Sequence, residues 1–117
     1  MKAFLIAASV LALGAVATTS AEARPRAASC TVEVDGRSWS GPCVFESERG
    51  GSFSISRPGQ RYFPGGYGVI SVTLYGRGVA EVRGLTRGGI NSRWGEARRS
   101  NRDRACWVGD DFRVCAY

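Results

Sequence analysis

The four cysteines constrain the fold of this chain more than any other feature. Cys30 and Cys43 lie in one half of the sequence, Cys106 and Cys115 lie at its end, and a short stretch separates the members of each pair. An even number of cysteines in a short chain is typical of disulfides in an oxidising compartment. Zinc is the alternative, but the spacings are wider than C-x-x-C and the chain contains no His. The pattern favours two disulfide bonds.

The first 23 residues have the pattern of a signal peptide. Lys2 precedes an apolar run from Ala3 to Ala17, and Ala21-Glu22-Ala23 fits an A-x-A cleavage site. This run is short for the ~30 Å core of a bilayer, so an uncleaved anchor is less favoured. A lipoprotein is less favoured still, because Cys30 lies well behind the apolar run. Cleavage after Ala23 would leave 94 of the 117 residues, enough for one domain.

The segment "CTVEVDGRSWSGPC" predicts a β-hairpin. Asp35-Gly36 suits a two-residue type I′ turn, because both central positions of that turn need a positive φ. The resulting register places Val34 opposite Arg37 and Val32 opposite Trp39. Val32, Val34 and Trp39 then share one face, and we expect this face to line the core.

The same register places Cys30 opposite Gly41, with Cys43 two residues further along on the same face. Pro42 has no N–H to donate to a neighbouring strand, so we expect a bulge or a strand edge at Gly41-Pro42. A bend there would bring Cys43 toward Cys30. We therefore predict a Cys30–Cys43 disulfide.

The terminal segment "ACWVGDDFRVCAY" predicts a second hairpin. If Asp110-Asp111 form its tip, Cys106 falls opposite Cys115 on a non-hydrogen-bonded pair, where Cα atoms lie about 4.5 Å apart. That separation is within the reach of a disulfide, and shifting the tip by one residue loses the match. We predict a Cys106–Cys115 disulfide, while the other two connectivities of four cysteines stay open.

The rest of the chain favours an all-β fold. Short runs at 50–57, 69–75 and 79–83 alternate apolar and polar residues and are separated by glycines. No window shows apolar residues at the helical period over three turns. We expect a small single-domain antiparallel sandwich or open barrel of about six to eight strands, stapled by two disulfides and spanning 30–117.

Three segments lack this alternation. Residues 24–29 are polar and are predicted to form a flexible arm ahead of the β domain. The glycine-rich segment 84–92 is predicted to be irregular, and 93–99 to be a strand or a short helical turn.

The charge suggests a candidate binding surface. All 15 cationic residues after position 23 are Arg, and the net charge is +6. Such a surface favours anionic partners, although it can also serve solubility alone. Arginine beside an aromatic ring can hold phosphate or sugar groups through bidentate hydrogen bonds and stacking. The candidate residues for an anionic partner are Arg93, Trp94, Arg98, Arg99, Arg102 and Arg104. The alternative is a solvated face with Trp94 in the core.

Enzymatic chemistry has little support. Without His there is no histidine general base and no Ser-His-Asp or Cys-His triad. The acid pairs Glu46/Glu48 and Asp110/Asp111 lie in turn-like context, where solvated carboxylates are favoured over a glycosidase pair or a calcium site. The two Arg-Gly-Gly segments are typical of strand-flanking turns rather than of nucleic-acid-binding tails. We expect no enzymatic activity, no metal, no cofactor and no nucleic-acid partner.

Three stretches carry a resemblance to a known group of proteins. "VEVDGRSWSGPCVF", "GSFSI" and the terminal "ACWV" followed by "CAY" resemble stretches of small exported bacterial proteins of uncharacterised function. The resemblance covers most of the chain after position 23 and implies an exported β domain with paired-cysteine hairpins. It implies no catalytic residues.

These features predict a non-enzymatic periplasmic or secreted binding protein, associated with the cell envelope, whose Arg-rich face meets an anionic partner. The alternative is an inhibitor-type protein–protein interaction module, for example an inhibitor of lysozyme. Charge argues against this alternative, because such lysozymes are themselves basic and like charges slow encounter. The chain after position 23 has no segment expected to span a membrane, and the sequence does not address the oligomeric state.

Overall fold

The computed structural model of the chain describes residue 14 and residues 24–117. Apart from Gly14, the predicted signal peptide therefore lies outside the described residues. Among the described residues, no helix is both long and apolar enough to cross a membrane.

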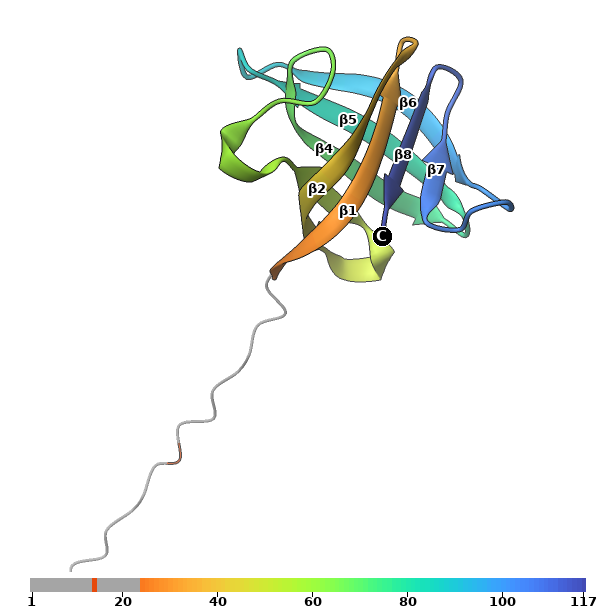
Figure 1. Ribbon diagram of the computed structural model, residues 1–117. Helices are drawn as coiled ribbons and strands as arrows, with labels where there is room; N and C mark the ends of the chain where they lie inside the picture. The colour runs from red at the N-terminus through yellow and green to blue at the C-terminus, as the bar shows by residue number, and fades with distance from the viewer. Residues whose placement is uncertain (1–13, 15–23) are drawn as a thin grey trace, which may run out of the picture.

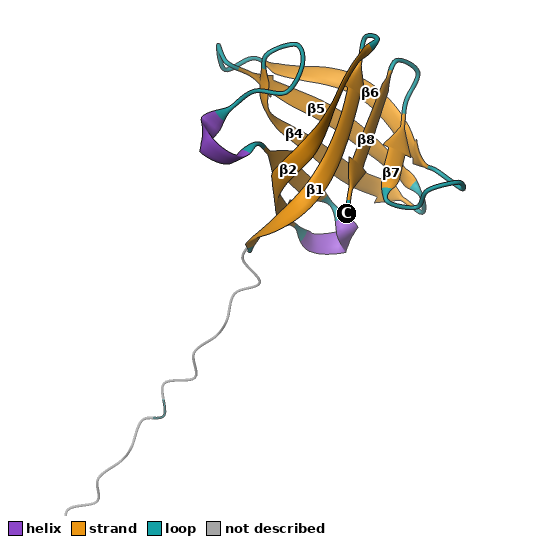
Figure 2. Cartoon of the chain, viewed as in Figure 1, coloured by secondary structure: helices purple, strands orange, loops and turns teal. Residues whose placement is uncertain are grey.

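Eight antiparallel strands form a closed barrel in which each strand pairs with the next along the chain and β8 pairs with β1 (Figures 1 and 2). The strands are β1 (Pro25–Val34), β2 (Arg37–Ser47), β3 (Phe53–Ser56), β4 (Tyr67–Gly76), β5 (Val79–Thr86), β6 (Asn91–Arg99), β7 (Cys106–Val108) and β8 (Phe112–Ala116). Two three-residue 3-10 turns, η1 (Arg49–Gly51) and η2 (Pro58–Gln60), lie between strands. The prediction of an antiparallel all-β fold with two disulfides is confirmed, and of the expected sandwich or open barrel the structure has a barrel, which is closed.

The alternating apolar side chains fill the inside of the barrel. The fully buried large residues include Val32, Ile55, Ile70, Val72 and Val114, each at most 1% exposed. These positions recur at every second residue of their strands, which is the pattern that one buried face of a sheet requires. The core thus occupies the barrel interior, and the polar side chains of the same strands face outward.

The first hairpin has the predicted turn and register. Asp35 and Gly36 have φ of 50° and 75°, as a type I′ turn requires, and Val32 pairs with Trp39. Val32 is buried, whereas Trp39 is only half-buried and packs edge to face against Phe63 with ring centroids 5.3 Å apart. Trp39 therefore lies at the margin of the core.

Both predicted disulfides are present, and they lie on opposite faces of the sheet. Cys30–Cys43 bridges a diagonal of the first hairpin, with Cα atoms 5.8 Å apart, and belongs to the interior core. Cys106 lies directly opposite Cys115, with Cα atoms 4.0 Å apart. Their neighbour Trp107 faces the interior, so the second disulfide lies on the outer face.

The segment 24–29 is not the flexible arm that we expected. Strand β1 begins at Pro25, and Pro25 to Ser29 pair with Pro42 to Glu46 of β2. Ser29 also exchanges two backbone hydrogen bonds with Tyr117, at 3.3 and 2.8 Å. The partners of this segment are β2 and Tyr117, the residue that follows β8, and both are distant in sequence, so the local sequence does not reveal them.

Of the two options for Gly41-Pro42, a bulge or a strand edge, the bulge is absent, because the β1–β2 register runs through these residues without a shift, whereas the other side of β2 is an unpaired edge before Val44. Ser29, the partner of Pro42, directs its backbone hydrogen bonds to Tyr117 on its other side. The Ser29–Pro42 pair is thus a non-hydrogen-bonded one, so the N–H that proline lacks would have pointed away from β1. Strand β3 pairs with β2 only from Val44 onward, so no ladder hydrogen bond is lost on that side either.

The prediction of an irregular segment at 84–92 is also wrong in large part. Strand β5 continues to Thr86 and β6 starts at Asn91, so only the turn between them is irregular. Of the two options for 93–99, the strand is observed, and its register shifts by one residue at Trp94. Gly95, next to this bulge, has a φ of 117°, which a residue with a side chain rarely adopts.

Candidate anion-binding site

The six predicted binding residues do not form one surface. Four of them lie on β6, and Arg102 and Arg104 lie in the loop between β6 and β7. Strand alternation and the bulge at Trp94 send these side chains in different directions. Arg93 lies on the outer face, Trp94 points into the interior, and the other four residues lie at one end of the barrel.

Arg93 belongs to the outer face of β5 and β6. Its Nε lies 3.5 Å from Oε1 of Glu81, and Nη2 of Arg83 lies 2.8 Å from the same oxygen. Arg93 is 64% exposed. A carboxylate between two guanidinium groups already balances part of their charge, so this place is a poor anion site.

Trp94 points into the barrel and not toward the arginines. Its ring lies 4.9 Å from that of Tyr67 and 5.5 Å from that of Phe112, and it packs against the buried core. Nε1 of Trp94 is buried and has no hydrogen-bond partner among the described residues. The alternative role that the sequence left open for Trp94, a core residue, fits this placement.

Trp94 and Arg98 also line a cleft of about 610 Å³ between β6 and the β7–β8 hairpin. The other charged side chains in its described lining are Glu96, Asp110 and Asp111. Three carboxylates against one guanidinium make this cleft acidic. It therefore does not suit an anion, although it lies beside the predicted arginines.

Arginines converge instead on a pocket of about 440 Å³ at the C-terminal end of β6. Its lining comes from the β4–β5 turn, the end of β6 and the β6–β7 loop, and it contains no Asp or Glu among the described residues. The lining residues are Arg77, Gly78, Arg98, Arg99, Ser100, Asn101 and Arg104. We call this the first arginine pocket.

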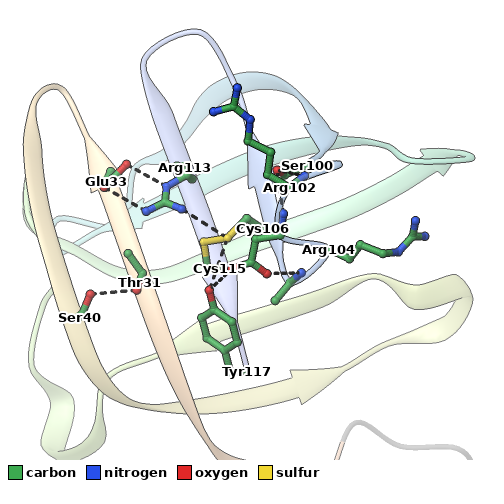
Figure 3. Close-up of a disulfide and its surroundings, with 12 residues drawn as sticks. Thr31, Glu33, Ser40, Ser100, Arg102, Arg104, Cys106, Arg113, Cys115 and Tyr117 are labelled. Atoms are coloured by element: carbon green, nitrogen blue, oxygen red, sulfur yellow. Dashed lines mark hydrogen bonds and ion pairs between the residues drawn. A yellow bond between two sulfur atoms is a disulfide. The ribbon is translucent and has the colours of Figure 1, made fainter.

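Backbone hydrogen bonds hold the walls of the first arginine pocket together. The Arg99 N–H donates to the Gly78 carbonyl at 3.0 Å, which joins β6 to the β4–β5 turn. The hydroxyl of Ser100 accepts from the N–H groups of Arg102 and Asp103, at 3.2 and 3.3 Å, and so shapes the β6–β7 loop. Figure 3 shows the side chains of Arg102 and Arg104 leaving this loop in different directions, so only Arg104 contributes to the pocket.

Arg99 is the best-fixed arginine of the pocket. Its guanidinium lies 5.3 Å from the centroid of the buried Trp107 ring, and its Nε donates to the carbonyl of Arg104 at 2.8 Å. The stacking on Trp107 occupies one face of the guanidinium, and the hydrogen bond to Arg104 occupies Nε. The two terminal nitrogens of Arg99 stay available to a ligand. Arg98 is less constrained, since it is 73% exposed and its Nη2 lies 3.1 Å from Glu96.

The one carboxylate of the β6–β7 loop is engaged elsewhere. Asp103 accepts hydrogen bonds from the hydroxyl of Tyr117 and from the N–H of Ala105, which hold the pKa of its carboxyl below the usual range. The same hydrogen bond raises the pKa of the Tyr117 hydroxyl. Asp103 therefore directs its charge to the C-terminal residue rather than to the arginines of the pocket.

A second ionic cluster covers the outer disulfide (Figure 3). Nε and Nη2 of Arg113 donate to the two carboxylate oxygens of Glu33, at 3.0 and 3.2 Å, and Nη1 of Arg113 lies 3.6 Å from the sulfur of Cys106. The hydrogen bond from Arg113 lowers the pKa of Glu33. Arg113 is thereby paired and is not available as an anion ligand.

Sequence reasoning missed Arg77, which it left in a Gly-Arg-Gly turn. The other arginines of the pocket are 21 or more positions away along the chain. In an up-and-down arrangement of β4, β5, β6 and β7, the β4–β5 turn and the β6–β7 loop lie at the same end, which is the signal that could have linked Arg77 to Arg99. Among the described residues, no group of three or more potential metal ligands occurs.

Comparison of the chain with models of protein families, with curated proteins and with solved structures gave no match.

Proposed function

We propose that this is a non-enzymatic binding protein of the periplasm or the cell exterior, and that its first arginine pocket holds phosphate groups of an anionic envelope component. The observation that carries the proposal is a pocket with four arginines and no carboxylate in its described lining. The two disulfides support an oxidising compartment, because such bonds persist there and are rare in the cytosol.

The residue types of the pocket favour phosphate over a carboxylate. Each guanidinium presents five N–H donors in a planar fork, which matches two oxygens of a phosphate in a bidentate pair. A terminal phosphate has three such oxygens and can accept from several arginines at once, whereas a carboxylate has two. Ser100 and Asn101 add neutral polar groups to the same wall.

The pre-positioning of Arg99 also supports a binding role. Long side chains lose rotamer freedom when they bind a ligand, at a cost of about 0.5–1.5 kcal/mol each. Stacking on Trp107 and the hydrogen bond to the Arg104 carbonyl already restrict Arg99 within the protein itself. Less freedom then remains to be lost on binding.

Vesicle co-sedimentation of the chain without its predicted signal peptide tests the proposal. The protein should bind phosphatidylcholine vesicles that carry phosphatidic acid, a phosphate monoester, and binding should weaken steeply as salt rises. Arg77→Ser with Arg104→Ser should weaken this binding about tenfold, as expected for lost charge-assisted hydrogen bonds. Arg37→Ser with Arg49→Ser removes the same charge outside the pocket and serves as the control. Equal losses in both double variants would contradict the proposal.

A second candidate, an inhibitor-type module for a basic protein such as a lysozyme, is supported by a different feature. The tips of the β1–β2 and β7–β8 hairpins lie at the end of the barrel opposite the first arginine pocket. A hydrogen bond from the Asp35 N–H to the Asp111 carbonyl, at 3.1 Å, joins these two tips. Asp35, Asp110 and Asp111 thus gather near one another on an otherwise basic molecule. If this candidate holds, Asp110→Asn with Asp111→Asn should abolish binding to lysozyme and leave vesicle binding unchanged.

A further inference from the structure

A second pocket lined by arginines lies at the opposite end of the barrel from the first. It has a volume of about 300 Å³ and is formed by the end of β3, the β3–β4 loop and the start of β4. Its described lining contains no Asp or Glu. The lining residues are Ser56, Arg57, Gln60, Arg61, Tyr62, Gly68 and Val69. We call this the second arginine pocket.

The second pocket repeats the construction of the first. The guanidinium of Arg57 lies 4.7 Å from the centroid of the Trp39 ring, and its Nη1 donates to the carbonyl of Tyr62 at 2.7 Å. Arg99 has the same two kinds of contact in the first pocket, with the ring of Trp107 and a loop carbonyl. In both pockets one arginine is fixed by an indole ring and a main-chain carbonyl oxygen. A further arginine lines the same pocket, and neither described lining contains a carboxylate.

A third arginine stands next to the second pocket. The guanidinium of Arg87 lies 4.4 Å from the centroid of the Tyr62 ring, and the Arg87 N–H donates to the Gly66 carbonyl at 3.1 Å. These contacts join the β5–β6 turn to the β3–β4 loop. Arg57 and Arg61 line the second pocket, and Arg87 contacts its lining residue Tyr62, so three arginines lie in or next to one small pocket.

The two pockets are separated by the length of one strand. Gly68 and Val69, at the start of β4, line the second pocket, and Arg77, just beyond its end, lines the first. The eight residue steps from Val69 to Arg77 span about 25 Å in an extended chain. Figure 1 shows the β3–β4 loop and the β4–β5 turn at opposite ends of β4. A ligand in one pocket thus leaves the other exposed to a different surface.

We propose that the second arginine pocket is another site for terminal phosphate groups, so that one molecule can bridge two phosphate-bearing surfaces. The second site stands on its own geometry, whereas bridging rests also on the function proposed for the first pocket. Because the two sites face opposite ends of one rigid barrel, one molecule can hold two surfaces at once, and many such bridges act together between surfaces that carry many phosphate groups.

Two probes test this proposal: inorganic pyrophosphate as a free phosphate compound, and vesicles whose lipid headgroups carry phosphate. Calorimetric titration with pyrophosphate should give two sites per chain, and Arg61→Ser with Arg87→Ser should reduce the stoichiometry to one. Vesicles of phosphatidylcholine and phosphatidic acid should cluster when protein is added, as seen by light scattering, and excess protein should reverse the clustering by filling every site singly. Arg37→Ser with Arg49→Ser is the control and should leave both readouts unchanged.

The double variants separate the second site from the first. Arg61→Ser with Arg87→Ser should abolish clustering while leaving vesicle binding through the first pocket, with an affinity loss of about tenfold or less. Clustering at the wild-type level in this variant, with a wild-type melting temperature, would overturn the second site. If Arg77→Ser with Arg104→Ser instead binds as the wild type does, the first pocket fails and the second site is retained. Sedimentation of the free protein must show a monomer, because clustering by a dimer would overturn bridging within one molecule.

Discussion

Tyr117, at the C-terminal end of the chain, donates its phenolic hydrogen to the carboxylate of Asp103 in the β6–β7 loop. The backbone of Tyr117 is held by Ser29 of β1, so this one residue connects three parts of the barrel end. The same loop carries Arg104 of the first arginine pocket and the carbonyl that fixes Arg99. The C-terminal residue thereby contributes to the shape of the candidate site.

The stability of the barrel should fall in acid. The pKa values of Asp103 and Glu33 are lowered in the folded protein by hydrogen bonds from Tyr117 and Arg113 respectively. Lowered values mean that the unfolded chain binds protons more readily, so this stabilisation is fully present above the unfolded values of 3.8 and 4.5. It is lost as the pH falls through the lower folded values. Both carboxylates are close to solvent, so the effect should be small, and thermal unfolding at pH 7, 5 and 3 should show a modest loss of Tm only below pH 5.

Tyr117→Phe provides the matched variant for this acid effect. It keeps the ring and removes the hydroxyl, so the contribution of Asp103 should shrink while that of Glu33 remains. The difference in Tm between pH 7 and pH 3 should then be smaller than in the wild type. An identical difference would show that the hydrogen bond does not contribute.

Each disulfide should stabilise the fold by about 3 kcal/mol, because the loops that they close are of similar length, with sequence separations of 13 and 9. Replacing both cysteines of Cys106–Cys115 by Ala should therefore lower the Tm by roughly 10 °C or more in a domain of this size. Peptide mapping without reduction should recover Cys30 linked to Cys43 and Cys106 linked to Cys115. Free thiols detected after the unreduced protein is unfolded in denaturant would contradict these linkages.

The hairpins were predictable because their information is local. Asp35-Gly36 permits one tight turn, and that turn alone sets the pairing of Val32 with Trp39. The opposition of Cys106 and Cys115 follows in the same way from the tip of the terminal hairpin. Closure of the barrel was not predictable, since β1 pairs with β8 across about 80 residues of sequence and no local pattern specifies that partner.

The candidate site was predicted only in part for a related reason. Arg98, Arg99 and Arg104 belong to one short segment and were selected together, but Arg77 and Arg57 depend on which loops meet at each end of the barrel. Trp94 was grouped with the arginines because it lies among them in the sequence, and the sequence left open whether 93–99 is a strand. The bulge at Trp94, beside Gly95 with its positive φ, sends the indole into the interior instead.

Gly84 should tolerate no side chain. A Cβ at this position would lie 2.5 Å from the ring of Tyr67 and 2.8 Å from Nε1 of Trp94. Both rings are packed in the barrel, so they cannot move aside without disturbing the core. Gly84→Ala should lower the free energy of unfolding by about 1–3 kcal/mol, measured by urea denaturation. Gly88→Ala is the control, because its Cβ would meet no atom within 4 Å. Equal stability of the two variants would contradict this packing.

Trp94→Ala distinguishes the two roles that the sequence allowed for this residue. Because the indole packs on Tyr67 and Phe112 inside the barrel, its removal should destabilise the fold by about 3 kcal/mol and lower the Tm by roughly 10 °C or more. At a temperature where the variant remains folded, its binding to vesicles with phosphatidic acid should match the wild type, since Trp94 does not line either arginine pocket. Arg99→Ser should show the opposite pattern, with weakened vesicle binding and a smaller change in Tm. A Trp94→Ala protein that keeps its Tm but loses vesicle binding would place the indole in the ligand site and contradict its assignment to the core.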